Sequence, residues 1–145
     1  MSITRALQDH HKHCDDAFAA AEEAAQRGDW ARCETAFVAL RDDITRHFGI
    51  EEDVLFPAFE AHTGMTGGPT HMMRHEHMQM RSLLEQLHAA LASKSADDFA
   101  GEAETLLVLM QQHNMKEENI LYPMCDQALG GDAEVGARIE QGLRA

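Results

Sequence analysis

Histidine and glutamate recur at the same spacing in two segments of the 145-residue chain, and both residue types can ligate a metal ion. Residues 47–57 read HFGIEEDVLFP and residues 113–123 read HNMKEENILYP. In each segment the His and the first Glu stand four positions apart, so a helix would place both side chains on one face. Neutral imidazole nitrogen and ionised carboxylate oxygen are ligands for borderline divalent cations. The pattern predicts a metal site.

The repeat extends beyond these two segments. The offset between them, from position 47 to position 113, is 66 residues, and the same offset relates His11 to His77. Both of these histidines fall within the apolar stripe of a predicted helix, where an unpartnered polar group costs about 1–3 kcal/mol. Each therefore needs a partner in the core. The candidate metal ligands are His11, His47, Glu51, His77, His113 and Glu117.

Six ligands are too many for one tetrahedral zinc ion. They fit two metal ions about 3.5–4 Å apart, bridged by the carboxylates and by an oxo or hydroxo group from solvent. Four imidazoles with two carboxylates favour iron over magnesium or calcium, which prefer oxygen-only shells. Two alternatives stay open: Glu118 could replace Glu117, and His10 could serve as a ligand if the first helix is rotated. Glu52 and Glu118 are otherwise expected to face solvent or to support the ligands.

Helices must position these groups, because helical periodicity runs through almost the whole chain. Ser2 is expected to cap the first helix, and Pro57 and Pro123 are expected to end or kink helices. We predict an all-α, up-down-up-down four-helix bundle with a short extra C-terminal helix. Residues 1–145 would form one domain of two pseudo-repeated hairpins, about 2–62 and 69–129. The predicted long helices cover about 2–27, 29–56, 69–92 and 97–129, and residues 62–68 form a loop.

HxxxEE followed by LFP or LYP in both hairpins, together with Glu76-His77, resembles the hemerythrin-like, or HHE cation-binding, domain family. The resemblance covers nearly the whole chain and implies a four-helix bundle with a non-haem di-iron centre. Carried over by motif, the family's ligands fall on the same six residues. One departure is Met73, which stands where oxygen-carrying members have a second histidine in the third helix. One iron would then have an open or water-filled position, which points toward bacterial members linked to iron, oxygen or nitric oxide responses and iron–sulfur repair.

Other side chains that could bind metal or form hydrogen bonds are assigned structural roles. His71 and His75 are out of phase with His77 and are interpreted as a polar helix face rather than a second metal site. Tyr122 could form a hydrogen bond near the site, but it is interpreted as a core residue, because its repeat partner, Phe56, has no hydroxyl. The metal pocket is expected to be lined by the apolar side chains of Leu7, Ile44, Met73 and Met110.

The amino-acid composition limits the classes of partner that we expect. The net charge of −13 argues against nucleic acid and anionic membrane, since both repel negative charge. No apolar run reaches the ~18 residues of a membrane span, and three cysteines without a CxxC pair suggest a reducing, cytoplasmic setting. The C-terminal segment could close the bundle or form a homodimer.

We predict a di-iron protein that binds or senses a small gas, oxygen or nitric oxide. The alternatives are a di-iron enzyme, of the peroxidase or nitric oxide and iron–sulfur repair type, or an iron storage or delivery protein. The prediction leans away from an enzyme, because no acid or base beyond the ligands stands out in the sequence.

Overall fold

The computed structural model describes residues 2–144, which are almost entirely helical and contain no β-strand among them. Two of the helical segments are single turns of π-helix, labelled η1 and η2. In chain order the elements are α1 (Arg5–Gln26), α2 (Trp30–Ile50), η1 (Glu51–Leu55), α3 (Phe56–Thr63), α4 (Pro69–Ala92), α5 (Ala96–Lys116), η2 (Glu117–Leu121), α6 (Tyr122–Leu129) and α7 (Ala133–Arg144).

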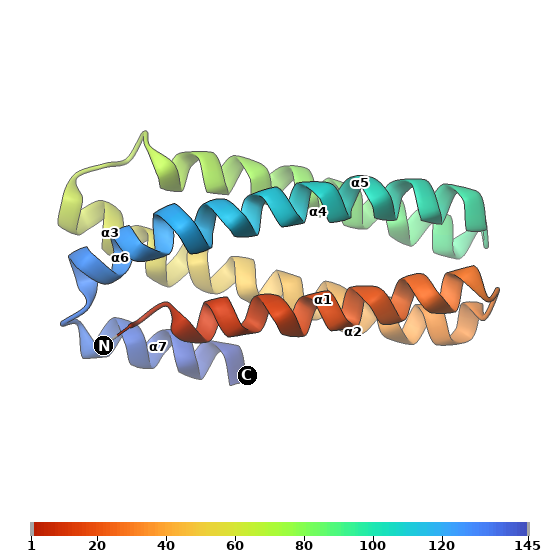
Figure 1. Ribbon diagram of the computed structural model, residues 1–145, viewed down its shortest axis with the longest axis horizontal. Helices are drawn as coiled ribbons and strands as arrows, with labels where there is room; N and C mark the ends of the chain where they lie inside the picture. Colours follow the sequence, from red (N-terminus) through yellow and green to blue (C-terminus); the bar gives the residue numbers. More distant parts are fainter. Residues whose placement is uncertain (1, 145) are drawn as a thin grey trace.

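The four long helices form the predicted bundle. α1 packs antiparallel to α2 and α4 antiparallel to α5, and the two hairpins meet where α1 contacts α5 and α2 contacts α4 (Figure 1). α3 and α6 lie together at one end of the bundle, and α7 runs back along α1 and α2 (Figure 1). The predicted all-α, up-down-up-down bundle with a short C-terminal helix is therefore confirmed. Among the described residues, no helix combines the length and apolar character needed to cross a membrane.

The ends of the helices follow local side-chain chemistry. Asp29 caps α2, because its carboxylate accepts a hydrogen bond from the backbone N–H of Arg32 at 3.1 Å. The predicted cap at Ser2 is wrong, since α1 begins only at Arg5. The Ser2 hydroxyl instead donates to Asp126 at 2.9 Å, and the same carboxylate accepts the backbone N–H of Ile3 at 3.0 Å. A carboxylate on α6 therefore holds the start of the chain.

Pro57 and Pro123 do not break the helical path of the chain, and each follows a π turn. Pro57 and Pro123 each stand at the start of the helix that follows η1 or η2. Proline has no N–H to donate and its ring clashes with the carbonyl four residues earlier, and one extra residue in the preceding turn accommodates both effects. The backbone N–H of Tyr122 accordingly bonds to the carbonyl of Glu117, five residues back. Each π turn begins at one of the candidate ligand glutamates, Glu51 or Glu117.

The apolar core is divided into two clusters by a layer of buried polar side chains. The larger cluster includes Phe37, Leu87 and Leu106 and fills the long helices. The smaller one includes Leu55 and Ile139 and lies where α3, α6 and α7 close the bundle. On α1, α4 and α5 the candidate ligands fall between the residues of the two clusters, and on α2 they lie near the boundary between the clusters. The fold therefore encloses the polar layer on both sides.

Candidate metal centre

The structure brings all six sequence-predicted ligands together in the polar layer. α1 supplies His11, α2 and η1 supply His47 and Glu51, α4 supplies His77, and α5 and η2 supply His113 and Glu117. All six side chains are buried, and four of them have no exposed surface.

Their ligand atoms form two overlapping groups. In the first, one atom from each of Glu51, His77, His113 and Glu117 lies within 4.8 Å of the others. In the second, the same holds for His11, His47 and Glu117. The Oε1 atom of Glu117 lies 3.1 Å from His11 Nε2 and 3.4 Å from His113 Nε2, so this carboxylate belongs to both groups. Two adjoining sites thus share one carboxylate.

Carboxylates hold the outer nitrogens of three of the histidines. Nδ1 of His11 is 2.6 Å from Glu118, and Nδ1 of His77 is 2.7 Å from Glu52. An imidazole that donates its Nδ1–H outward presents the lone pair of Nε2 to the cluster. Glu52 and Glu118 therefore contact histidines on the side that faces away from the cluster. Glu118 does not join the two buried groups of ligand atoms, so it does not replace Glu117.

Glu76 plays the same part for His113, and sequence reasoning missed it. Its Oε1 atom lies 2.8 Å from His113 Nδ1, and Lys116 contacts its other oxygen at 2.6 Å. Arg81 anchors Glu52 in a similar way, through two contacts of 2.8 and 2.9 Å. The sequence repeat could have indicated Glu76, because it places position 76 opposite His10, and both residues directly precede a candidate ligand.

His47 differs from the other three in its outer partner. Its Nδ1 atom lies 2.9 Å from Nδ1 of His10, which is half-buried beside the cluster. Burial, followed by the charge of His47, lowers the pKa of His10 to about 4, so that this imidazole is neutral near pH 7. His10 thus contacts His47 from beside the cluster, and His11 rather than His10 belongs to the group of possible ligand atoms around Glu117.

Tyr122 is buried in the core, as predicted, and its hydroxyl also reaches the middle of the cluster. Its hydroxyl donates to Glu51 Oε2 at 2.6 Å and lies 3.3 Å from Nε2 of both His11 and His47. Five residues span about 1.4 turns of an α-helix and would turn Tyr122 away from Glu117. The π turn of η2 brings positions i and i+5 onto one face instead. Helical periodicity alone could not find this residue.

The charges of the cluster favour a cation at its centre. Burial lowers the pKa of His113, but the negative carboxylate of Glu117, whose Oε1 lies 3.4 Å from Nε2, outweighs burial and raises that pKa to about 9. The pKa values of His11 and His77 are raised for the same reason, by Glu117 and Glu51 respectively. Burial alone would raise the pKa of Glu51, yet the neighbouring imidazoles hold it well below its usual range. Two buried carboxylates therefore stabilise positive charge between them.

The residues fit a bound metal ion. Among the described residues, four buried atoms of the cluster have no hydrogen-bond partner: Nε2 of His77 and of His113, Oε1 of Glu51 and Oε2 of Glu117. Leaving such atoms unpaired costs about 1–3 kcal/mol each. All four are nitrogen or oxygen donors of the kind that bind borderline divalent cations.

Apolar residues also adjoin the cluster. Leu7, Ile44, Met73 and Met110 are all buried, and Ile44 and Met110 line a cavity beside His11 and His47. This cavity has a volume of about 20 Å³, and its other lining residues are mainly apolar. His71 and His75 are exposed on α4, in agreement with their interpretation as a polar face.

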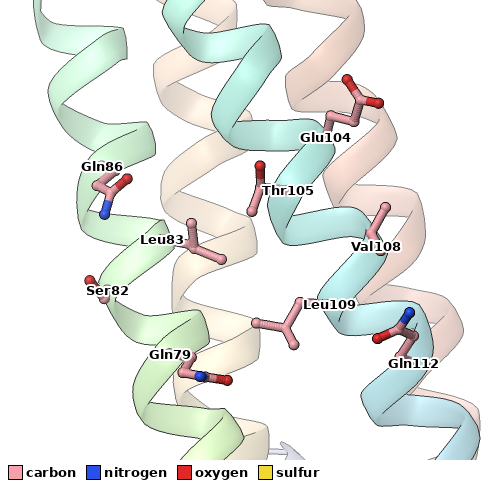
Figure 2. Close-up of a pocket in the computed structure, with 9 residues that line it drawn as sticks. All are labelled: Gln79, Ser82, Leu83, Gln86, Glu104, Thr105, Val108, Leu109 and Gln112. Carbon is pink, nitrogen blue, oxygen red and sulfur yellow. The ribbon is translucent and has the colours of Figure 1, made fainter.

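One hollow on the surface lies away from the six candidate ligands. It is a groove of about 740 Å³ between α4 and α5, and its lining residues include Gln79, Leu83 and Val108 (Figure 2). None of the six candidate ligands lines it.

Comparison with known proteins identifies the family. The family model described as the hemerythrin HHE cation-binding domain matches residues 2–125. A DNA nickase from Nostoc sp. (strain PCC 7120) is 31% identical over 100 residues, which make up 69% of this chain and 27% of the nickase. The chain thus spans about a quarter of the length of that relative. No solved structure matches the chain. Because the family match covers most of its length and the buried His/Glu cluster supports cation binding, the chain belongs to the hemerythrin HHE cation-binding domain family.

Proposed function

We propose that the six residues bind two non-haem iron ions and that the iron pair holds a small gas, oxygen or nitric oxide. The observation that carries this proposal is the pair of overlapping donor groups, which share Glu117. One group contains His11 and His47, and the other contains His77 and His113. A carboxylate common to both groups is what a bridge between two metal ions requires.

The donor types support iron. Four imidazole nitrogens and two carboxylates suit a borderline cation better than magnesium or calcium, which prefer oxygen ligands. Glu118, Glu52 and Glu76 orient three of the imidazoles, and such outer partners raise the basicity of a ligand histidine. Bound ferrous ions would supply electrons and an open coordination position for a diatomic gas.

The side chains around the cluster would exclude water and limit the size of the molecule that binds there. Ile44, Phe48, Met80 and Met110 line the cavity of about 20 Å³ beside His11. That volume is close to one water-sized probe sphere, and its apolar walls offer water few hydrogen bonds. These dimensions and walls suit a diatomic molecule better than a larger substrate.

We expect the protein from iron-replete growth to contain about two iron ions per chain. Its visible absorption should bleach and recover reversibly when the reduced protein is cycled between argon and oxygen. Iron content by plasma emission spectrometry and absorption spectra test both points. Iron that is absent, or present at one equivalent or less, contradicts the two-metal site. Two equivalents without reversible bleaching contradict reversible oxygen binding, and the same cycle with nitric oxide then tests that gas.

One observation favours an enzyme as the second candidate. The phenol of Tyr122 holds a proton on its oxygen, 2.6 Å from Glu51 Oε2. Burial, followed by the two nearby glutamates, raises the pKa of this phenol well above its usual range, so that it stays protonated. A hydroxyl at the centre of the cluster can donate a hydrogen bond, and in a reaction a proton, to a peroxide bound there.

If the protein is a peroxidase, Tyr122→Phe should lower the rate of peroxide consumption about 100-fold or more, which is typical for loss of a proton donor. The ring would still fill its place in the core, so iron content should stay the same. Steady-state peroxide consumption with a reducing co-substrate present, by the iron-loaded wild type and the variant at equal iron content, measures this effect. Equal rates in both proteins would exclude Tyr122 as the proton donor.

A further inference from the structure

The pseudo-symmetry of the two hairpins fails at one position beside the centre. Position 76 of the second hairpin is Glu76, which contacts His113 and is tied to Lys116. The corresponding position of the first hairpin, 66 residues earlier, is His10, which contacts His47. A carboxylate that supports a ligand is thus replaced by an imidazole that can itself bind a metal ion.

A second group of ligand atoms surrounds this imidazole. One atom from each of His10, His13 and Asp43 lies within 4.8 Å of the others. His13 Nε2 is 2.9 Å from Asp43 Oδ2, and the rings of His10 and His13 are stacked with their centroids 5.4 Å apart. In the second hairpin, positions 79 and 109 hold Gln79 and Leu109, so the repeat does not explain this group.

The group opens to the surface. It lines a pocket of about 570 Å³ together with Asp9 and Glu140. Two arginines also line the pocket, but each has a carboxylate partner: Arg46 contacts Asp43 Oδ1 at 3.4 Å, and Arg144 contacts Glu140 at 3.4 Å. The contact of Arg46 is to the other oxygen of Asp43, so Oδ2 faces the imidazoles.

We propose that His10, His13 and Asp43 form a second, surface-accessible site for a borderline divalent cation of the Fe²⁺ type. Two imidazoles and one carboxylate form the ligand set that protein sites use for ferrous iron with open positions. Water would fill the remaining positions, because the pocket is open. A cation with exchangeable water ligands enters and leaves readily, as a cation on its way to a buried centre must. The existence of this surface site does not depend on the proposed gas-binding function.

Titration of the metal-free protein with Co²⁺ tests the site, with bound cobalt counted by equilibrium dialysis. His13→Ala is the chosen variant, because the His13 side chain is 63% exposed and lies outside the buried cluster. His75→Ala, which also removes an exposed histidine from a helix, is the matched control. We expect the wild type and His75→Ala to bind one more cobalt ion per chain than His13→Ala. Equal stoichiometry in all three proteins overturns the surface site.

The same titration separates this proposal from the proposed function. If the buried centre binds no cobalt, the wild type should still exceed His13→Ala by one ion.

Discussion

Replacing Glu117 with glutamine is expected to remove metal from both halves of the buried centre. The carboxylate belongs to both groups of ligand atoms, and its Oε1 lies near the Nε2 atoms of His11 and His113. Glutamine keeps the shape but removes the negative charge that offsets two cations. The loss in affinity should be at least about 100-fold, the upper end of what removal of a mere outer partner costs. Iron content should fall below one ion per chain.

Two measurements keep this result separate from unfolding. The metal-free variant should have the same helical circular dichroism as the metal-free wild type, because glutamine fills the same volume. Glu104→Gln, at an exposed position on α5, is the matched control and should retain the iron content of the wild type. Retention of two iron ions by Glu117→Gln would contradict the shared bridge, and loss of iron in both variants would show an effect of charge in general.

Replacing Phe37 with alanine is expected to lower the free energy of unfolding by about 3–5 kcal/mol, the usual cost of removing a fully buried aromatic side chain. Phe37 has no exposed surface and lies in the larger core cluster. Its ring also stacks on that of His88 with centroids 5.6 Å apart, so truncation leaves a cavity with an unsupported neighbour. Urea denaturation of the metal-free protein measures the change without the additional stabilisation that bound metal would give.

The control for this variant is Met78→Ala, because Met78 is 67% exposed on α4. Its free energy of unfolding should change by less than about 0.5 kcal/mol, as for most surface substitutions. A loss below about 1 kcal/mol in Phe37→Ala would mean that the core collapses to fill the cavity. Iron content should be unchanged, because Phe37 is not among the groups around the buried centre.

The sequence by itself determined the elements and the residues that meet. Spacings such as that of His47 and Glu51 are local, because one turn of helix places residues four apart on the same face. The sequence repeat adds information that a single motif lacks. It pairs His11 with His77 and predicts that both hairpins contribute the same kinds of side chain to the cluster. The bundle and the convergence of the six residues follow from these two regularities. Their role as ligands is the proposal that metal analysis tests.

Only the tertiary structure decided what surrounds those six residues. Tyr122 enters the cluster because a π turn changes the register after Glu117, and no periodicity of the sequence reports one extra residue in a turn. Glu76 and His10 reach histidines on neighbouring helices, so their partners depend on how α4 meets α5 and how α1 meets α2. Contacts between helices are set by the packing of whole faces, whereas the repeat records only positions along each helix.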